Sequence, residues 1–514
     1  MIGIVDAMKY GVIALGLVAG VPLCAHAARI YYVDSMDGRD EYDGLSPQTA
    51  FRSLARVNEL ALEPGDSVLL RGGSVLDGTL VPKGRGAAGR PITIGMYGTG
   101  PMPRIDAHGA HAAAIHLRNT EYITVQDLHV TNYGEDRGDS RKGIFVDIED
   151  FGTAREIAIR RNRVTNVNGE LVKERGGTGI AFRNQGAKVP SRFDGLLIEH
   201  NHLARTERNG ITGSSGHVGR EEWFPSHHVV IRNNLLEEVP GDGIVPVGCD
   251  GAIVSGNVIR HGTPLLLKRH SAAAGIWPWG SDNTLIEFNE VSHHRAMFDG
   301  QGFDADWNCR GTIIQFNYSH HNDGGFLLVC NNGGSLAPWN GGNTGTIIRY
   351  NVSYNDGLRE VDATSSPGHR APAININGPV DGVVIHDNLF IVPRKTSPKV
   401  DDKLVMATAW SGWPKNVRLE RNTFIVQGKA GFDTTRGTSF VYSGNVFVGA
   451  IALPAELGDE SPVQQTAADP STFVFAGTGI EVGLRLLQKY HPHPIPHGSG
   501  PSEPMPASKP AAAP

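Results

Sequence analysis

Hydrophobic residues recur along most of this chain in short runs separated by turn residues, and the runs follow one repeated pattern. Each unit reads aliphatic-x-x-Asn-x-apolar, followed some residues later by Gly-apolar-x-apolar. The pattern begins at about residue 115 and fades past residue 450. Its asparagines are 23 to 39 residues apart, and they are Asn162, Asn201, Asn234, Asn257, Asn289, Asn317, Asn351, Asn388, Asn422 and Asn445.

A period of this length predicts a solenoid, a propeller or an array. The units hold short β-type runs and no convincing helix, whereas leucine-rich and ankyrin repeats need a helix or a different signature. The shortest unit, 23 residues, is too short for the four strands of a propeller blade. The pattern therefore favours an all-β chain wound as a parallel β-helix. We expect the repeated Asn to form a ladder that satisfies backbone groups at one turn of every coil.

The segments outside the repeat predict caps and a tail. Ser46-Pro47 opens a helical segment in which Phe51, Leu54 and Val57 have helical spacing. Near the other end, residues 482–490 predict a short closing helix or strand. The expected organisation is a cap with the first coils over 28–114, the β-helix over 115–450, a C-terminal cap over 451–490 and a disordered Pro- and Ala-rich tail over 491–514.

Residues 1–27 have the pattern of a secretory signal. Lys9 precedes an apolar run, Val12 to Leu23, that is too short to span a bilayer. Ala25-His26-Ala27 then matches a small-x-small cleavage site. We therefore expect an exported protein, periplasmic or extracellular. An uncleaved anchor is the alternative.

Composition narrows the classes of function. The chain has 65 glycines with no period of three, 40% hydrophobic residues and a net charge of −6 without a basic run. It is therefore neither collagen-like nor disordered, and nucleic acid and anionic membranes are poor partner candidates. Three cysteines remain after the signal, Cys249, Cys309 and Cys330, and this odd number argues against a disulfide scaffold.

The opening residues Tyr31-Tyr32-Val33-Asp34, Asp43-Gly44-Leu45-Ser46-Pro47 and Pro64-Gly65-Asp66, together with the Asn repeats, resemble one known superfamily. It is the right-handed parallel β-helix, or pectate-lyase-like, superfamily of polysaccharide lyases and glycoside hydrolases, and the resemblance covers roughly residues 30–450. It implies a single-stranded right-handed parallel β-helix with an N-terminal capping helix. A capped solenoid of this size has no need of a partner subunit, so we expect a monomer.

The stretch from Phe298 to Asn308 holds three carboxylates, Asp299, Asp304 and Asp306. If Gly302 to Trp307 is a strand, Asp304 and Asp306 leave the same face, with Cα atoms roughly 6.5 Å apart. Carboxyl groups at this separation suit acid–base chemistry on a glycosidic bond, and they also suit a Ca²⁺ ion.

Alignment of the Gly-apolar strands places Trp277 and Trp279 on the same face, one rung from the carboxylates, about 4.8 Å away. We expect both indoles to be exposed and to stack on sugar rings, unless a loop covers them. In the next coil the same alignment puts Leu327 and Val329 on this face and turns Cys330 into the core.

A column of histidines precedes the carboxylate strand. Four residues after the repeated Asn come His261, His293, His321 and Asn355, and His294 and His320 adjoin them. His293, His294, His320 and His321 are candidates for substrate binding, for proton transfer or for metal binding, and a polar turn ladder is the alternative. Lys268, in a basic loop, is a candidate for contacting substrate.

Three functions fit these residues. A glycoside hydrolase would use Asp304 and Asp306, or one of them with Asp299, as acid and as base or nucleophile, without a cofactor. A polysaccharide lyase would hold Ca²⁺ with Asp299, Asp304, Asp306 and perhaps Asp323, and it would need a basic residue, for which Lys268 would have to reach in from its loop. A non-catalytic glycan-binding protein would need only the tryptophans. The hydrolase acting on a polysaccharide or oligosaccharide is the favoured hypothesis.

Overall fold

A computed structural model describes most of the chain. The described residues are 27–138, 140–261, 272–333, 339–360, 370–396, 402–434, 438–454, 457, 464–466 and 477–491. The expected signal and most of the expected tail lie outside these residues, as does Lys268. None of the described helices is long and apolar enough to cross a membrane.

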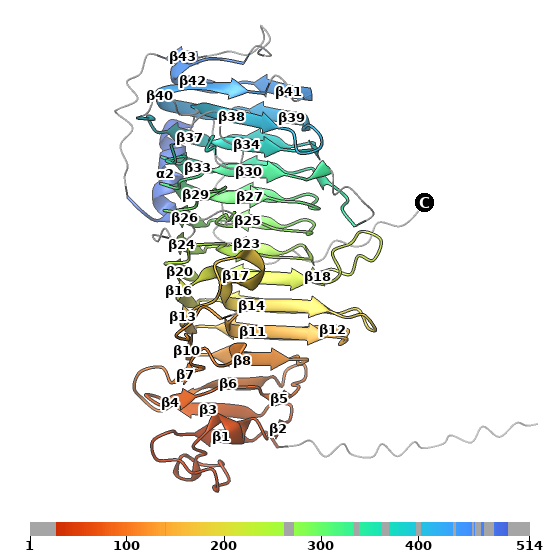
Figure 1. Ribbon diagram of the computed structural model, residues 1–514, viewed down its shortest axis with the longest axis vertical. Coiled ribbons are helices and arrows are strands. Elements are labelled where there is room, and N and C mark those ends of the chain that lie inside the picture. Colours follow the sequence, from red (N-terminus) through yellow and green to blue (C-terminus); the bar gives the residue numbers. More distant parts are fainter. Residues whose placement is uncertain are drawn as a thin grey trace, which may run out of the picture.

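The described chain winds into one long solenoid of stacked coils (Figure 1). Most coils contribute a strand to each of three parallel sheets, and each strand pairs with the equivalent strand of the coils before and after it. The expected parallel β-helix is therefore confirmed. The three sheets enclose a single continuous apolar core, which runs from Tyr31 to Ile451.

The first sheet has 18 strands and extends along the whole solenoid. Its strands are β1 (Ile30–Val33), β3 (Ser67–Arg71), β6 (Ile92–Tyr97), β9 (Ile123–Gln126), β12 (Thr153–Arg160), β15 (Arg192–Glu199), β18 (Ser226–His227), β19 (Val230–Arg232), β22 (Cys249–Asp250), β23 (Ile253–Ser255), β25 (Leu285–Glu287), β28 (Ile313–Gln315), β31 (Asn343–Thr344), β32 (Ile347–Arg349), β35 (Val380–Asp381), β36 (Val384–His386), β39 (Lys415–Glu420) and β41 (Thr438–Ser443).

The second sheet follows the first by one short turn in each coil. Its strands are β4 (Val75–Asp77), β7 (Arg104–Asp106), β10 (His129–Asn132), β13 (Arg163–Val167), β16 (His202–Thr206), β20 (Leu235–Glu237), β24 (Val258–Arg260), β26 (Glu290–Ser292), β29 (Tyr318–His320), β33 (Val352–Tyr354), β37 (Leu389–Val392), β40 (Thr423–Asp433), β42 (Val446–Ile451) and β43 (Gln464–Thr466).

The third sheet carries the residues of the candidate site. Its strands are β8 (Ala113–Arg118), β11 (Lys142–Glu149), β14 (Gly177–Gln185), β17 (Arg208–Ser215), β21 (Ile244–Val245), β27 (Phe303–Ala305), β30 (Leu327–Cys330), β34 (Ile374–Asn377) and β38 (Lys403–Thr408). Between β21 and β27 the rung is completed by single bridges from Ile276 to Ile244 and to Phe303. The second half of β40 pairs with β38, so this long strand turns the corner between two sheets.

The repeated glycine has a steric cause. It opens the third-sheet strand of its coil, where successive coils approach closely. A Cβ atom at Gly243 would lie 2.4 Å from the carbonyl oxygen of Gly275, and one at Gly275 would lie 2.4 Å from that of Gly302. Any side chain at these positions would therefore force the coils apart, which explains the Gly-apolar signature in the sequence.

The expected ladder of asparagines is present, and all ten positions belong to it. Each ladder Asn is buried at the turn between the first and second sheets. Asn289, for example, accepts hydrogen bonds on Oδ1 from the backbone N–H and the side-chain amide of Asn257, at 2.9 and 3.0 Å. It donates to Oδ1 of Asn317 and to the carbonyl of Val254. The residue before each ladder Asn has a positive φ, which bends the chain into the next sheet.

Several short elements lie outside the three sheets. The segment expected to be one helix after Ser46 forms two short pieces, the 3-10 helix η1 (Pro47–Thr49) and the helix α1 (Leu54–Val57), each capped by a serine that accepts from a backbone N–H. The remaining elements are β2 (Ala61–Leu62), which pairs with β5 (Lys83–Gly84), the 3-10 helix η2 (Lys173–Arg175) and the helix α2 (Ile480–Tyr490).

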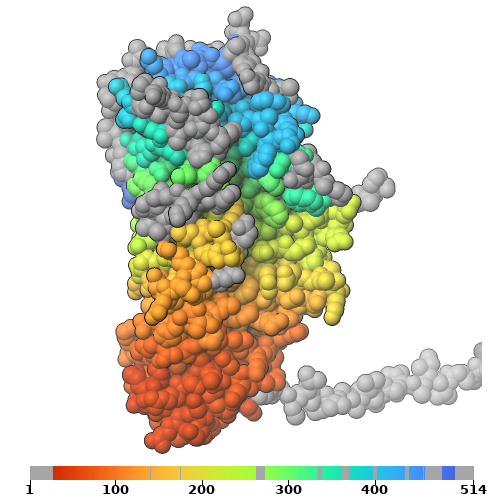
Figure 2. Space-filling model, viewed as in Figure 1, coloured from red at the N-terminus to blue at the C-terminus, as the bar shows by residue number. Residues whose placement is uncertain are grey.

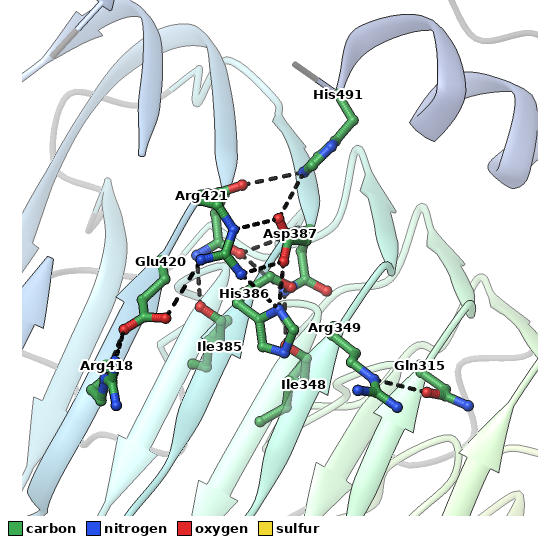
Figure 3. A network of polar contacts seen from close by, with 12 residues as sticks. Gln315, Ile348, Arg349, Ile385, His386, Asp387, Arg418, Glu420, Arg421 and His491 are labelled. Atoms are coloured by element: carbon green, nitrogen blue, oxygen red, sulfur yellow. Dashed lines mark hydrogen bonds and ion pairs between the residues drawn. The ribbon is translucent and has the colours of Figure 1, made fainter. Parts of the chain in front are cut away.

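The C-terminal helix α2 lies along the outside of the second sheet (Figure 1). It packs Val482, Leu486 and Leu487 against apolar side chains such as Tyr318 and Val352. At its end, His491 lies 3.2 Å from the carbonyl oxygen of Arg421, in a network centred on Asp387 (Figure 3). The helix therefore covers the side of the solenoid.

Candidate active site

The carboxylates Asp304 and Asp306 leave the same face of β27, as the sequence predicts. Both line one cavity of about 980 Å³ on the outer face of the third sheet. One carboxyl oxygen of Asp304, one carboxyl oxygen of Asp306 and Sγ of Cys330 all lie within 4.8 Å of one another. The coils that form the cavity belong to the yellow-to-cyan part of the surface in Figure 2.

The third carboxylate, Asp299, reaches the cavity from the turn that precedes β27. Its backbone has φ +53°, a left-handed conformation that aspartate tolerates better than most residues. The guanidinium of Arg359 fixes this turn, because it donates to the carbonyls of Ala296 and of Asp299 itself, the latter at 2.9 Å. All three carboxylates expected from the sequence are thus brought together.

Trp277 and Trp279 line the same cavity, one rung before the carboxylates. The expected exposure of both indoles is wrong for Trp277, which is only 6% exposed. Its indole N–H donates to Oδ1 of Asp242 at 3.1 Å, and the ammonium of Lys173 lies 4.4 Å from the centre of its ring system. Trp279 is partly exposed and packs near Trp339.

The expected register of the next coil is wrong by one residue. β30 pairs Leu328 with Asp304, so Leu328 and Cys330 face the cavity in place of Leu327 and Val329. The cause is an extra residue at the start of the strand, where the N–H groups of Phe326 and Leu327 both donate to the carbonyl of Ala373. Cys330 is therefore a cavity residue, and its thiol donates to Oδ1 of Asp306 at 3.1 Å.

The three carboxyl groups differ in their surroundings. Burial raises the pKa of Asp304 well above its usual value, and the charges of Asp306 and Asp299 raise it further. Oδ1 of Asp304 is buried without a hydrogen-bond partner. This carboxyl group is therefore held in its neutral form.

Asp306 has the donors that Asp304 lacks. Burial raises the pKa of Asp306, and Lys173, the Cys330 thiol and the backbone N–H of Trp307 oppose that increase. The Trp307 N–H donates at 2.7 Å. Asp306 is also partly exposed to the cavity. Among neighbouring carboxyls, the one that accepts hydrogen bonds and faces a cation is the one that ionises first.

Asp299 combines access to the cavity with a raised pKa. Burial raises the pKa of its carboxyl group to about 6, against the opposing charges of Lys173 and Arg359. The residue is partly exposed. A carboxyl group with this pKa is protonated in mildly acidic solution and can give up its proton there.

Two residues of the site carry no sequence signal that would have identified them. Lys173 comes from η2, far from the carboxylates in sequence, and Asp242 lies between two glycines, where an aspartate usually indicates a turn. Asp242 is buried in an ion pair with the fully buried Arg208. Burial raises the pKa of Asp242, but Lys173 and Arg208 outweigh it and hold that pKa below its usual value.

The remaining walls of the cavity are neutral. Leu328 and Ala409 contribute apolar surface, and the Trp307 and Trp410 rings meet edge to face with centroids 4.9 Å apart. Neutral polar side chains line the strands on either side of the carboxylates. They are Asn209, Thr212, Ser214, Ser215, Asn375 and Asn377.

The histidines do not meet the carboxylates. None of the described residues that line the cavity is a histidine. His293 and His321 have positive φ at successive turns between the second and third sheets, and their rings stack with centroids 5.4 Å apart. His294 is fully buried with Nε2 at 3.0 Å from the Gly241 carbonyl oxygen, and His320 is buried beside Glu290. This arrangement is a polar turn ladder.

The donor set does not fit calcium. Asp304, Asp306 and Cys330 are the described groups whose ligand atoms come within 4.8 Å of one another. Calcium takes six to eight oxygen ligands, and a thiol is a poor donor to it. Asp323, expected as a further ligand, lies outside the cavity lining and instead accepts from Arg295 at 3.0 Å.

Comparison with known proteins supports the fold and shows similarity to named enzymes. A family model described as right handed beta helix region matches residues 198–403. A lacto-N-biosidase of Bifidobacterium longum subsp. longum is 27% identical over an alignment of 434 residues, and the match covers 66% of this chain and 26% of that protein. The chain thus spans about a quarter of the length of this curated relative.

Two crystal structures of the GH136 lacto-N-biosidase from Eubacterium ramulus are also similar. The native protein matches with a TM-score of 0.60 and 26% identity, over 83% of this chain and 68% of that chain. The selenomethionine derivative matches over the same shares with a TM-score of 0.61. With the observed coils, these matches confirm the resemblance to the right-handed parallel β-helix superfamily.

Proposed function

We propose that this member of the right-handed parallel β-helix superfamily is a glycoside hydrolase, and that Asp299 and Asp306 are its catalytic pair. One observation carries the proposal: two carboxyl groups open on one cavity, and only around Asp306 do hydrogen-bond donors offset the increase in pKa that burial causes. Asp299 has a pKa of about 6, whereas donors and a cation stabilise ionised Asp306. An acid and a carboxylate that flank one bond are what glycosidic cleavage requires.

In this proposal each of the three aspartates has its own role in the hydrolysis. Protonated Asp299 donates its proton to the glycosidic oxygen as the bond to the leaving sugar breaks. Ionised Asp306 acts at the anomeric carbon on the other side, as nucleophile or as the base that activates water. Asp304 has a buried oxygen and a pKa well above its usual range. It is the neutral neighbour of Asp306, which limits the negative charge around that carboxylate.

The residues that line the cavity favour a neutral sugar as substrate. Trp277, Trp279, Trp307 and Trp410 offer aromatic surface, and the other polar lining is mostly uncharged. The similar proteins are named lacto-N-biosidase, so a glycoside of lacto-N-biose is the first substrate to test.

A lyase mechanism is less well supported. It needs a base and, on an acidic substrate, a cation for the uronate carboxylate. The carboxylates of Asp242, Asp306 and Asp299 raise the pKa of Lys173 despite the desolvation of its ammonium group in the cavity, so the ammonium remains protonated and is no base. The donor set also does not fit calcium.

The proposal also covers the location of the protein and its partners. Residues 1–27 support export to the periplasm or the medium, where oligosaccharides are available. Our proposal assigns both catalytic carboxylates to the same chain and takes the active protein to be a monomer. Neither nucleic acid nor a membrane surface is needed as a partner.

The full chain should be purified and incubated with a panel of neutral oligosaccharides, among them glycosides of lacto-N-biose, and of uronate-containing polysaccharides. Released reducing ends and the ultraviolet absorbance of unsaturated uronates should be followed together. Reducing ends without that absorbance are expected, and Asp306→Asn should abolish them while Asp433→Asn, outside the cavity lining, should not. Unsaturated products would establish a lyase instead. Binding without turnover in any reaction would leave only a glycan-binding protein.

A further inference from the structure

The cavity contains a cation, Lys173, that comes from a different part of the chain. Lys173 begins η2, in an excursion of the coil between β13 and β14 that is closed by a bridge from Glu170 to Gly176. The excursion folds back tightly on itself. A Cβ atom at Gly169 would lie 2.3 Å from the backbone nitrogen of Gly177. The turn thus requires glycine, and it brings Lys173 over the outer face of the third sheet.

Lys173 places its ammonium group over the face of Trp277. Nζ lies 4.4 Å from the ring centroid, within the range of a cation–π contact. The residue as a whole is exposed, but its ammonium end lines the cavity. Trp277 is in turn anchored to buried Asp242 through its indole N–H. The position of the ammonium is therefore set by a buried aromatic ring.

The charges that surround Lys173 come from several elements. Asp242 lines the cavity near Lys173, and it already pairs with Arg208, which is fully buried. Asp299 and Asp306 face it from the turn before β27 and from the end of that strand, with neutral Asp304 between them. The Cys330 thiol adjoins Asp306, and Arg359 lies behind Asp299. Lys173 is thus the cation that all four aspartates share.

We propose that Lys173 is a positioning residue for the hydrolysis, whose ammonium, held over Trp277, keeps Asp306 ionised while Asp299 retains its proton. This inference rests on the proposed function of the same site. A cation at this place balances the charge of one catalytic carboxylate, so that the cavity is close to neutral when Asp299 is protonated. Loss of the cation would leave three unbalanced carboxyl groups that compete for protons.

The first test is the pH dependence of kcat/KM for wild type, Lys173→Met and Lys173→Arg. Without the ammonium both carboxyl groups hold protons more tightly, so both limbs of the profile should move to higher pH, by about one unit. At a pH below the acid limb of the wild-type profile, the Met variant should then be about tenfold slower. Lys173→Arg should restore the wild-type profile, and Lys188→Met, at an exposed loop lysine, should not change it. A higher KM with an unmoved profile would show that Lys173 only contacts substrate.

The second test needs no substrate and therefore separates this inference from the proposed function. The ammonium stabilises the fold only when the nearby carboxyls are ionised. The loss of Tm in Lys173→Met should therefore be small at pH 4 and should grow as the pH rises to 7.5. A loss of Tm that is the same at every pH would overturn the proposal, whether or not the wild type hydrolyses any glycoside.

Discussion

The thiol of Cys330 donates a hydrogen bond of 3.1 Å to Oδ1 of Asp306. The contact joins adjacent rungs of the third sheet, β30 and β27, and it exists because one extra residue at the start of β30 turns Cys330 toward the cavity. The thiol holds its proton, because burial raises its pKa well above the usual value. Cys330 therefore acts as a fixed donor to the ionised form of Asp306.

Removal of this donor should change the pH profile. In Cys330→Ala the pKa of Asp306 should rise, because the ionised form loses a hydrogen bond. The acid limb of kcat/KM should move up by roughly one unit, the order expected for a hydrogen bond to a charged group. Cys330→Ser, which keeps a donor, should restore most of the wild-type profile. An unchanged acid limb in Cys330→Ala would show that the thiol does not influence Asp306.

Asp299→Asn should separate activity from stability. The folded-state pKa of about 6 lies above the ordinary aspartate value of 3.8, so protonation favours the folded state. That contribution is fully present below pH 3.8 and is lost as the pH rises through 6. The variant should match wild type near pH 4 and exceed its stability above pH 6, by on the order of 1–3 kcal/mol. Asparagine also tolerates the positive φ.

On a substrate with a poor leaving group, the same variant should lose activity by roughly 10²- to 10⁴-fold, as expected for removal of a general acid. In the wild type, activity should fall as the pH rises past about 6, where Asp299 loses its proton. Thermal unfolding at pH 4 and pH 7.5, together with initial rates, checks both parts. Equal stability of the two proteins at pH 7.5 would contradict a raised pKa for Asp299.

Trp410 should contribute to substrate binding rather than to chemistry. The residue is 38% exposed, lines the cavity and meets the Trp307 ring edge to face. Trp410→Ala should raise KM about tenfold, or roughly 1.4 kcal/mol, with kcat nearly unchanged. Trp223→Ala, at a tryptophan that packs under Arg220 outside the cavity, is the matched control. A loss confined to kcat would assign Trp410 a role in the reaction itself.

Removal of divalent cations should leave the activity unchanged. The cavity presents a thiol and an ammonium beside its carboxylates, and Asp323 is paired with Arg295. Dialysis against EDTA should alter neither the rate nor Tm. Loss of activity that calcium restores would contradict the assignment of the carboxylates to acid–base chemistry.

Much of the fold was readable from the sequence because its causes are local and repeated. From the coil of β12 onward each coil buries an amide at the same turn, so ten asparagines mark ten coils. Every third-sheet strand in the middle of the solenoid opens at a close approach, so glycine marks its start. These two signals sufficed to place Asp304, Asp306, Trp277 and Trp279 on one face.

The rest of the site depends on tertiary contacts that the repeat pattern of the sequence does not predict. One extra residue at Phe326 shifts the register of β30, so Cys330 faces the cavity and not the core. A sequence pattern averaged over many coils does not reveal a bulge that occurs in one coil. Lys173 reaches the carboxylates from an excursion several coils earlier. The histidines are periodic because turns are periodic, and their spacing was therefore a signal of structure.

The most direct test of the central claim compares Asp299→Asn and Asp306→Asn on two glycosides of one sugar, one with a good leaving group and one with a poor leaving group. A good leaving group needs no proton, so Asp299→Asn should retain most of its activity on that substrate and lose it on the other. Asp306→Asn should be inactive on both. If both variants lose the same activity on both substrates, or if neither loses any, Asp299 and Asp306 are not the acid and the carboxylate of a glycoside hydrolase.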